Sequence, residues 1–284
     1  MSIITISRES YSRGREVAAR VAEMLGYRYV AREVVSEASR EFHIPEIRLV
    51  RAIHDAPSVF EKLTHGKEKY LACFRAALLK QLQGDNVVYH GLGGYFFAKD
   101  LQNGLKVRIY ADTEDRVNLV MERNQVVRTE ASRILKADDQ ERRRWGRSLF
   151  GMDITDPILY DMVIHVGKLS VEDAASLVAQ VAGMERFQTT TESRQAVENL
   201  ALAAEVKATL LEIKPDARVY ADEGRVYVGA RLSFTDGKRG LVEEMKKLVR
   251  AVPGVKMVDV KPLRLTGKMH HFSIGSHFPA GGRY

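Results

Sequence analysis

Short apolar segments rich in β-branched residues alternate with helical patterns through the first 182 residues of the chain. These segments span residues 3–6, 27–30, 86–90, 105–110 and 160–164. Strands that alternate with helices predict an α/β fold, with a parallel five-stranded sheet covered by helices on both faces. Because such sheets bind ligands at the carboxyl ends of their strands, we expect the loops after Ile6, Tyr89 and Tyr110 to meet at one site.

The first sixteen residues, MSIITISRESYSRGRE, have the layout of a phosphate-binding loop. A β-branched run ends at Ile6, a polar loop follows, and a helical pattern begins at Gly14. In this layout backbone N–H groups and the helix N-terminus point at an anion. The common spelling G-x-x-x-x-G-K-[ST] is met only in part, because Glu9, Arg15 and Glu16 replace its first glycine, its lysine and its hydroxyl residue. The motif alone therefore leaves phosphate binding open.

The charge and the single cysteine narrow the function classes. The 284 residues include 44 basic and 37 acidic ones, and the formal net charge of +7 suits a protein that handles phosphorylated ligands. We find no zinc-finger spacing, RNA-binding aromatic signature or zipper, so we expect no sequence-specific nucleic-acid binding. No apolar run reaches the roughly 20 residues of a membrane-spanning helix. Cys73 is the only cysteine, which excludes an internal disulfide and favours a reducing cytoplasm.

The character of the sequence changes after residue 182. We predict a first domain over 1–182, a polar linker over 183–195, a second domain over 196–263 and a basic, histidine-containing tail over 264–284. The second domain has the pattern helix, strand, strand, helix, strand, which predicts a small α+β (αββαβ) unit. Glu223-Gly224 between its first two strands predicts a tight hairpin turn.

Several segments of the first domain share their order and spacing with one family. They are residues 4–9 with 14–16, 29–33, 121–123, 139–142, 150–153 and 156–161. In these segments the chain resembles the cytidylate kinase-like family, a branch of the P-loop nucleoside monophosphate kinases. The resemblance implies a P-loop kinase-like sheet, binding of ATP with Mg²⁺, and phosphoryl transfer to CMP or a related monophosphate. That family itself uses arginine in place of the usual loop lysine.

The resemblance also implies roles for individual residues. The phosphate-binding candidates are Arg8, Ser12, Gly14, Arg15, Glu16 and Arg123. The catalytic candidates are Arg15, Arg142 and Arg143, of which the last two belong to a lid that Asp139 would orient by an ion pair. The acceptor-side candidates are Arg32, Gly91 and Gly93, and the magnesium candidate is Glu16.

The same candidate residues also fit purely structural interpretations, in which they bind no ligand. Arg15 also fits an exposed arginine in the first turn of a helix. Glu16 fits a helix-start glutamate that the helix dipole favours. Arg142 and Arg143 fit a solvated helix face on which Asp138 and Glu141 are their partners.

The chain departs from the family pattern around the expected site. Tyr11 and Arg13 replace glycines of the family's loop, and Ala31 replaces an acid after the second strand. Leu92 stands where the family has an arginine suited to gripping a monophosphate. We expect side chains at Tyr11 and Arg13 to narrow the conformations of the loop and to obstruct close approach of its backbone to phosphate.

The second domain resembles a BON domain. The segment Val252-Pro253-Gly254-Val255-x-x-Val258, Gly229 and the order of the helices carry this resemblance. It implies binding of a phospholipid or a protein partner.

Three hypotheses follow for the whole chain. The first is a nucleoside monophosphate kinase. The second is a catalytically impaired nucleotide sensor that signals through the BON-like domain. The third is an interaction protein that uses the kinase-like fold as a scaffold. The helical insert over residues 45–83 is expected either to cover the acceptor site or to form the surface of a homodimer.

Overall fold

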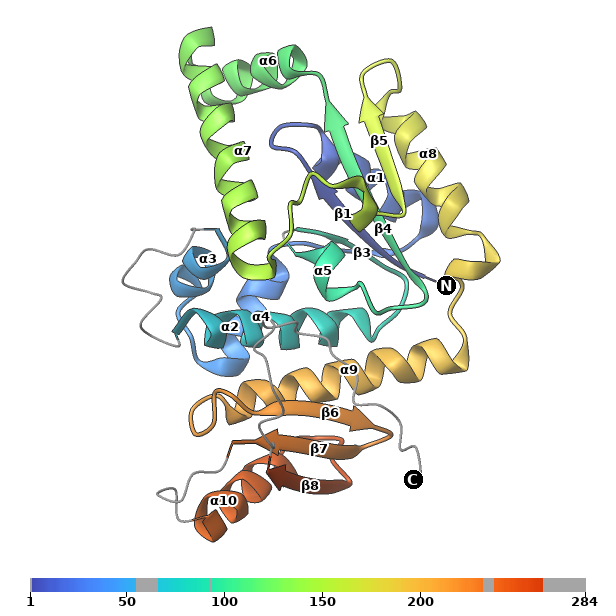
Figure 1. Cartoon of the computed structure of the whole chain (residues 1–284). Helices are drawn as coiled ribbons and strands as arrows, with labels where there is room; N and C mark the ends of the chain where they lie inside the picture. Colours follow the sequence, from blue (N-terminus) through green and yellow to red (C-terminus); the bar gives the residue numbers. More distant parts are fainter. Residues whose placement is uncertain (1, 55–65, 92, 232–237, 263–284) are drawn as a thin grey trace. The chain divides into compact units, whose positions relative to one another are not determined.

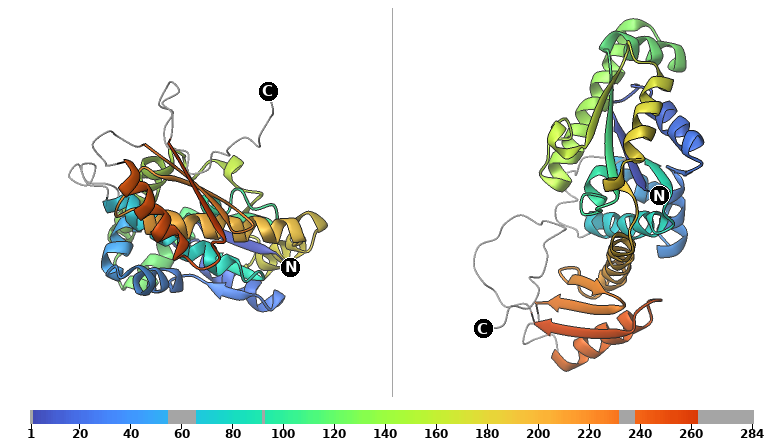
Figure 2. Two further views of the ribbon diagram at one scale, coloured as in Figure 1. Left: turned by 90° about the horizontal axis from the view of Figure 1, so that it is seen from below. Right: turned by 90° about the vertical axis from the view of Figure 1, so that its right-hand side faces the viewer.

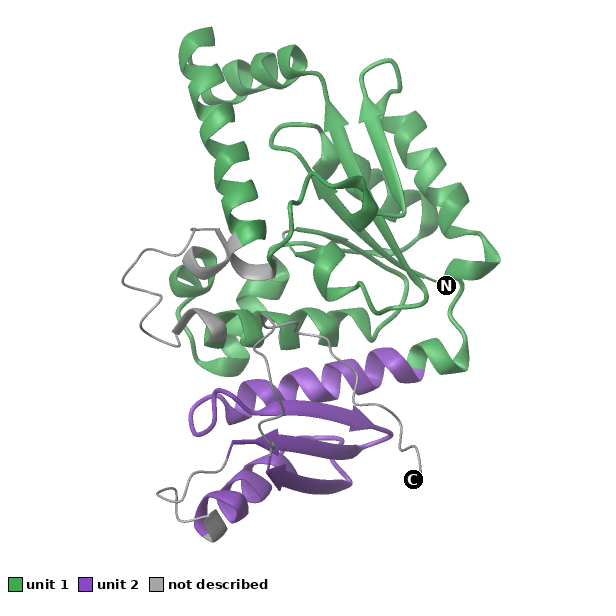
Figure 3. Ribbon diagram, viewed as in Figure 1, with its two compact units in different colours: residues 1–194 green, residues 195–284 purple. Residues whose placement is uncertain are grey.

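The structure is a computed structural model that describes residues 2–54, 66–91, 93–231 and 238–262. The chain divides into two compact units, Met1–Arg194 and Gln195–Tyr284, which Figure 3 colours separately. The boundary falls in the first turn of helix α9 (Thr191–Leu210). This helix begins inside the stretch predicted to be a linker, so the predicted linker is wrong from Thr191 onward. The 264–284 tail lies outside the described residues.

The first unit is an α/β layer structure (Figure 1). Its elements are, in chain order, β1 (Ile3–Arg8), α1 (Gly14–Leu25), β2 (Arg28–Val30), α2 (Glu33–Phe42), α3 (Glu46–His54), α4 (Gly66–Leu82), β3 (Val87–His90), α5 (Gly94–Phe97), β4 (Gly104–Ala111), α6 (Thr113–Asn124), α7 (Arg128–Phe150), η2 (Pro157–Leu159), β5 (Met162–Val166), α8 (Val171–Ala182) and η3 (Glu185–Phe187). The strands form one parallel five-stranded sheet in the order β2-β3-β1-β4-β5, which confirms the predicted fold class. No helix of the described residues is long and apolar enough to cross a membrane.

The two faces of the sheet have different chemistry. Side chains alternate between the faces of a strand, and on β4 the residues Leu105, Val107 and Ile109 join the apolar cluster that α1 and α8 cover. The intervening residues of β4 therefore face the opposite side, toward α5 and α7. The right-hand view of Figure 2 shows α1 and α7 on opposite sides of the sheet. This second face carries the polar side chains of the site.

Helices α6 and α7 pack against each other, and their apolar contact holds α7 in place. The pair is joined by the buried residues Val117, Val120, Ala131 and Leu135, with Tyr11 of the loop after β1 packed against them. Gly146 of α7 lies so close to the following segment that an added Cβ would stand 2.2 Å from Ile154 Cγ2. Both contacts fix α7 across the ends of β1 and β4.

Local sequence signals hold at several helix ends. Ser170 and Asp173 form the capping box at the start of α8, where the Ser170 hydroxyl accepts from the Asp173 N–H at 3.1 Å. Asp112 is the N-cap residue of α6, but its side chain makes no capping hydrogen bond. Its Oδ1 instead lies 3.4 Å from His165 Nε2.

The second unit is a small α+β layer structure. Its elements are α9, β6 (Arg218–Asp222), β7 (Arg225–Ala230), α10 (Lys238–Arg250) and β8 (Met257–Pro262). The sheet order is β6-β7-β8, with β6 antiparallel and β8 parallel to β7, so the predicted αββαβ order is confirmed. Glu223 and Gly224 both have positive φ, 46° and 86°, as a two-residue hairpin turn between twisted strands requires.

Candidate functional site

The loop between β1 and α1 ends where the start of α1 packs closely against the end of β1. Gly14 is the first residue of α1, and an added Cβ there would stand 2.6 Å from Arg8 Cβ. Only glycine therefore lets the start of α1 approach the end of β1 this closely. Ser12 lies before it, fully buried, with its hydroxyl 3.0 Å from the Glu9 carbonyl oxygen and 3.1 Å from the Ile109 carbonyl oxygen. The Ser12 hydroxyl thus holds the loop onto β4.

Tyr11 and Arg13, which replace glycines of the family pattern, both adopt the left-handed conformation with φ of 58°. The loop therefore follows a backbone path that glycine would take without strain, although side chains are present at both positions. Tyr11 packs its ring against the α6–α7 cluster, and Asn124 Nδ2 donates to its hydroxyl at 3.4 Å. Arg13 is exposed at the N-cap of α1. The side chains at Tyr11 and Arg13 therefore strain the backbone of the loop, and the loop keeps the backbone conformation that glycines would adopt.

Replacing Arg13 with glycine is expected to raise the free energy of unfolding by up to about 1 kcal/mol, because strain of about 1–2 kcal/mol is relieved against a smaller entropic cost. The matched control is Ala19→Gly, at an exposed position within α1. It is expected to lower the free energy of unfolding by about 1 kcal/mol. Urea denaturation of the two variants measures both values. Equal losses in the two variants would contradict the strain at Arg13.

Arg116 of α6 ties the loop to α7. Its side chain is buried, and its NH1 lies 3.1 Å from Glu9 Oε2 and its NH2 2.6 Å from Asp139 Oδ2. Its Nε donates to the Ser10 carbonyl oxygen at 2.7 Å. We call Arg116, Glu9, Ser10 and Asp139 the Arg116 cluster. Asp139 thus forms its ion pair with Arg116, whereas the sequence had suggested Arg142 or Arg143 as its partner.

Arg8 at the end of β1 is held by a neutral histidine. Arg8 Nε donates to His90 Nε2 at 2.9 Å, and Tyr29 Oη lies 3.3 Å from His90 Nδ1. Burial lowers the pKa of His90 to about 3, and the charges of Arg8, Arg142 and Arg15 act in the same direction. Burial also lowers the pKa of Arg8 to about 10, with Arg142 adding to the effect. The site therefore holds positive charge that burial and like charges disfavour.

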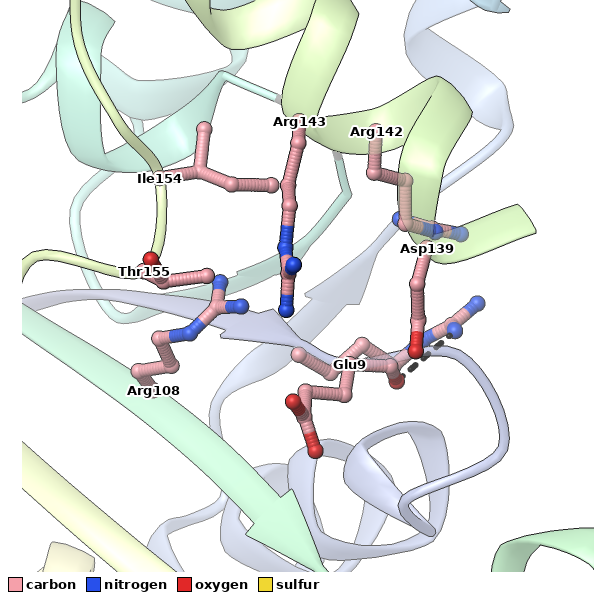
Figure 4. A pocket seen from close by; sticks show the side chains of 8 residues that line it. Glu9, Arg108, Asp139, Arg142, Arg143, Ile154 and Thr155 are labelled. Carbon is pink, nitrogen blue, oxygen red and sulfur yellow. Dashed lines mark hydrogen bonds between the residues drawn. The ribbon is translucent and has the colours of Figure 1, made fainter. Parts of the chain in front are cut away.

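A small cavity of about 10 Å³ lies between β4, α7 and the segment before β5, and we call it the arginine cavity (Figure 4). Its lining residues are Arg8, Glu9, Arg108, Asp139, Arg142, Arg143, Ile154 and Thr155. Arg142 Nε donates to Ser10 Oγ at 2.9 Å, and burial lowers the Arg142 pKa. The two carboxylates of the lining, Glu9 and Asp139, are already paired with Arg116. The arginines of the lining are thus in excess over the acids available to neutralise them.

Other predicted phosphate ligands lie around this centre. Arg15 is exposed at the start of α1, and its charge acts on the pKa of Tyr29, which burial raises. Arg123 and Glu16 form a half-exposed ion pair at 2.6 Å. Trp145 is buried, and its ring lies 3.2 Å from the position of an added Cβ on Gly93.

The acceptor-side candidates are divided between two places. Arg32 lines a separate open groove of about 380 Å³ formed with residues of α2 and α4, so the structure does not bring it into the arginine cavity. Gly91 and Gly93 follow β3, where an added Cβ on Gly91 would stand 2.2 Å from Tyr89 Oη and where Gly93 has a φ of 75°. Leu92 between them lies outside the described residues.

The donor atoms available for Mg²⁺ are few. No group of three or more His, Cys, Asp or Glu side chains suited to a metal occurs in the part of the chain that the structure describes. Mg²⁺ in kinase sites is bound by one or two carboxylates, by phosphate oxygens and by water. Glu16 fits the role of a single carboxylate ligand to an ion that arrives with ATP, provided that Arg123 releases it.

The sequence analysis missed Arg108 and Arg116. Both are almost fully buried, at 3 % and 4 % exposure. The only available signal for Arg108 was a basic residue within an apolar strand pattern. Arg116 lay in a helix whose other charged residues are mostly exposed.

The chain is similar to several solved structures. An uncharacterized protein from Eubacterium ventriosum matches 64% of this chain and 97% of its own, with a TM-score of 0.51 and 21% identity. A shikimate kinase from Acinetobacter baumannii in complex with shikimate matches 64% of this chain and 92% of its own, with a TM-score of 0.36 and 18% identity. A gluconokinase from Sinorhizobium meliloti matches 64% of this chain and 93% of its own, with a TM-score of 0.39 and 14% identity.

The sequence comparisons decide the family. No curated protein matches the chain. The family model described as "Cytidylate kinase-like family" matches residues 3–168, which is more than half of the chain and includes the loop, the Arg116 cluster and the arginine cavity. The chain therefore belongs to the cytidylate kinase-like family.

Proposed function

We propose that the first unit binds ATP and transfers its γ-phosphoryl group to a nucleoside monophosphate, CMP or a related one. The observation that carries this proposal is the arginine cavity, where Arg8, Arg108, Arg142 and Arg143 converge while the two carboxylates of its lining pair with Arg116. A buried excess of cations is costly unless an anion neutralises it. Phosphate groups supply that charge.

The residues around the cavity suit phosphoryl transfer, which depends on positioning and on neutralising charge at phosphate oxygens. The start of α1, opened by Gly14, presents backbone N–H groups to a phosphate, and Arg15 follows it. Arg142 and Arg143 of α7 neutralise charge that develops on the moving phosphoryl group. Because α7 covers the cavity, it also excludes water. Mg²⁺ bound with ATP would supply further neutralisation of the phosphate oxygens.

A coupled ADP-release assay tests turnover. The wild-type chain is given ATP and Mg²⁺ with CMP, dCMP, UMP, AMP or GMP in turn, and one acceptor is expected to raise ADP release well above the background with ATP alone. Arg142→Gln is expected to lower kcat/KM at least tenfold. The matched control is Arg147→Gln, because Arg147 lies on the same helix but forms an exposed pair with Asp153 at 2.5 Å. If no acceptor raises ADP release, the proposed transfer is wrong.

A second candidate function is a nucleotide sensor with little turnover, whose output passes to a BON-like C-terminal unit. The observation that favours it is the loop itself, because Tyr11 is packed into the α6–α7 cluster and the strained backbone leaves the loop little freedom to adjust during a reaction. The αββαβ order of residues 195–262 supports the BON-like assignment.

Calorimetry and hydrogen exchange separate the two functions. ATP binding without ADP release, together with changed amide exchange in residues 195–262 on ATP addition, would support the sensor. ATP binding that leaves exchange there unchanged would contradict it. If no nucleotide binds at millimolar concentration, the kinase-like fold is a scaffold for interactions instead.

A further inference from the structure

Arg108 is a buried cation that the proposed transfer leaves without a defined role. It lies in the middle of β4, on the face opposite the apolar cluster, and is 3 % exposed. It makes no ion pair with any residue that the structure describes. Burial disfavours the charge of this guanidinium, but Tyr160 and Tyr110 act in the opposite direction, and the pKa of Arg108 is raised.

Two tyrosines hold the guanidinium of Arg108 in a fixed plane. Arg108 NH1 donates to Tyr160 Oη at 3.3 Å. The guanidinium carbon lies 4.8 Å from the centre of the Tyr110 ring and 5.5 Å from the centre of the Tyr160 ring. These rings attract the cation, and both tyrosine side chains act on it through hydrogen bonds, but neither is a carboxylate. The Nε is buried and has no hydrogen-bond partner among the described residues.

The free side of this guanidinium faces another cation. Figure 4 shows the side chains of Arg108 and Arg143 pointing toward one another across the arginine cavity, with Thr155 beside them. Glu9 of the lining pairs with Arg116 at 3.1 Å, and the charge of Arg108 also acts on this carboxyl. Arg108 is buried, whereas Arg143 is exposed. Two cations that face each other repel unless an anion lies between them. A planar guanidinium with unused N–H groups is suited to the oxygens of a phosphate.

We propose that Arg108 and Arg143 form a phosphoryl-binding subsite on the β4 side of the arginine cavity. The inference rests on the proposed function for the identity of its ligand, which is a phosphate group of either ATP or the acceptor monophosphate. A cavity of about 10 Å³ has room for about one water molecule. Arg143 on α7 therefore moves outward when the phosphate enters, while Arg108 on the sheet stays in place.

Binding of ATP, CMP and inorganic tripolyphosphate to Arg108→Met tests the subsite by titration calorimetry. The matched control is Lys106→Met, because Lys106 lies two residues earlier on the same face of β4 and pairs with Asp161 at 3.3 Å outside the cavity. In Arg108→Met the affinity for at least one of the three probes is expected to fall tenfold or more. Loss for CMP alone assigns the subsite to the acceptor, and loss for ATP and tripolyphosphate assigns it to the donor. Lys106→Met is expected to bind all three as the wild type does.

The variant Arg108→Lys provides the same test if Arg108→Met fails to fold. It keeps the charge but lacks the planar fork, and its affinity for the same probe is expected to fall at least threefold. If either folded variant binds all three probes with wild-type affinity, Arg108 is only a structural cation between two tyrosines and the subsite is wrong. The subsite is also wrong if the wild type binds none of the probes.

The two proposals fail in different ways. ADP release by the wild type together with unchanged affinities in Arg108→Met would overturn the subsite alone. Tripolyphosphate binding that Arg108→Met weakens, without ADP release from any acceptor, would overturn the proposed transfer and support the subsite.

Discussion

Replacing Arg116 with leucine is expected to lower the free energy of unfolding by about 3–5 kcal/mol, because a buried ion pair then loses one partner. The change leaves the carboxylates of Glu9 and Asp139 close to each other without their shared cation. It also removes the hydrogen bond that the Ser10 carbonyl oxygen accepts at 2.7 Å. Since the Arg116 cluster joins the loop to α7, ATP binding should fall below detection even at a temperature where the variant is folded.

Urea denaturation and ATP calorimetry measure these effects. The matched control is Arg128→Leu, because Arg128 pairs with Glu114 at 2.5 Å while both side chains are more than half exposed. It is expected to change stability by less than about 1 kcal/mol. Adding Asp139→Asn to Arg116→Leu should recover part of the lost stability, since it removes one of the two unpaired charges. A loss in Arg116→Leu no larger than in Arg128→Leu would contradict this role.

The architecture could be predicted because its signals are local. The apolar run Ile3–Ile6 predicts a buried strand wherever it lies in the fold, and the Ser170 capping box needs only residues three apart. The hairpin at Glu223 depends on one glycine. The linker was less predictable at its end, because the polar residues after Thr191 lack apolar spacing and still continue into α9.

The centre of the site was harder to predict because its partners are distant in sequence. Asp139 and Arg142 are three residues apart on a helix, which favours a local ion pair. The structure instead pairs Asp139 with Arg116, which becomes its neighbour only when α6 packs against α7. A basic residue within an apolar strand pattern is only a weak signal that an arginine such as Arg108 is buried, because basic residues are mostly exposed.

In the loop between β1 and α1, two residues other than glycine adopt a backbone conformation that favours glycine. Tyr11 and Arg13 differ from the glycines of the family pattern, and their side chains were expected to narrow the conformations of the loop and to obstruct close approach of its backbone to phosphate. The observed φ of 58° at both positions means that tertiary contacts, including the packing of Tyr11 against the α6–α7 cluster, impose the conformation. A residue other than glycine makes a positive φ energetically costly, but it does not exclude that conformation.

Acidification from pH 7 to pH 5 is expected to destabilise the wild-type chain by about 2 kcal/mol more than the variant His90→Gln. The native pKa of His90 is about 3, because the ring is buried and faces Arg8, Arg142 and Arg15. In the unfolded chain this histidine takes up a proton near pH 6.5. Between these two values the unfolded state binds the extra proton, so stability falls as the pH falls. Glutamine stays neutral and can still accept the hydrogen bond from Arg8 Nε.

Urea denaturation at both pH values, on wild type and variant, isolates the contribution of His90 from that of the acids. The matched control is His165→Gln, because His165 is exposed and lies 3.4 Å from Asp112 Oδ1. A His90→Gln variant that loses as much stability as the wild type would show that His90 is protonated in the folded protein. Arg8 could then no longer donate to its Nε2, and the support of Arg8 in the arginine cavity would have to come from another residue.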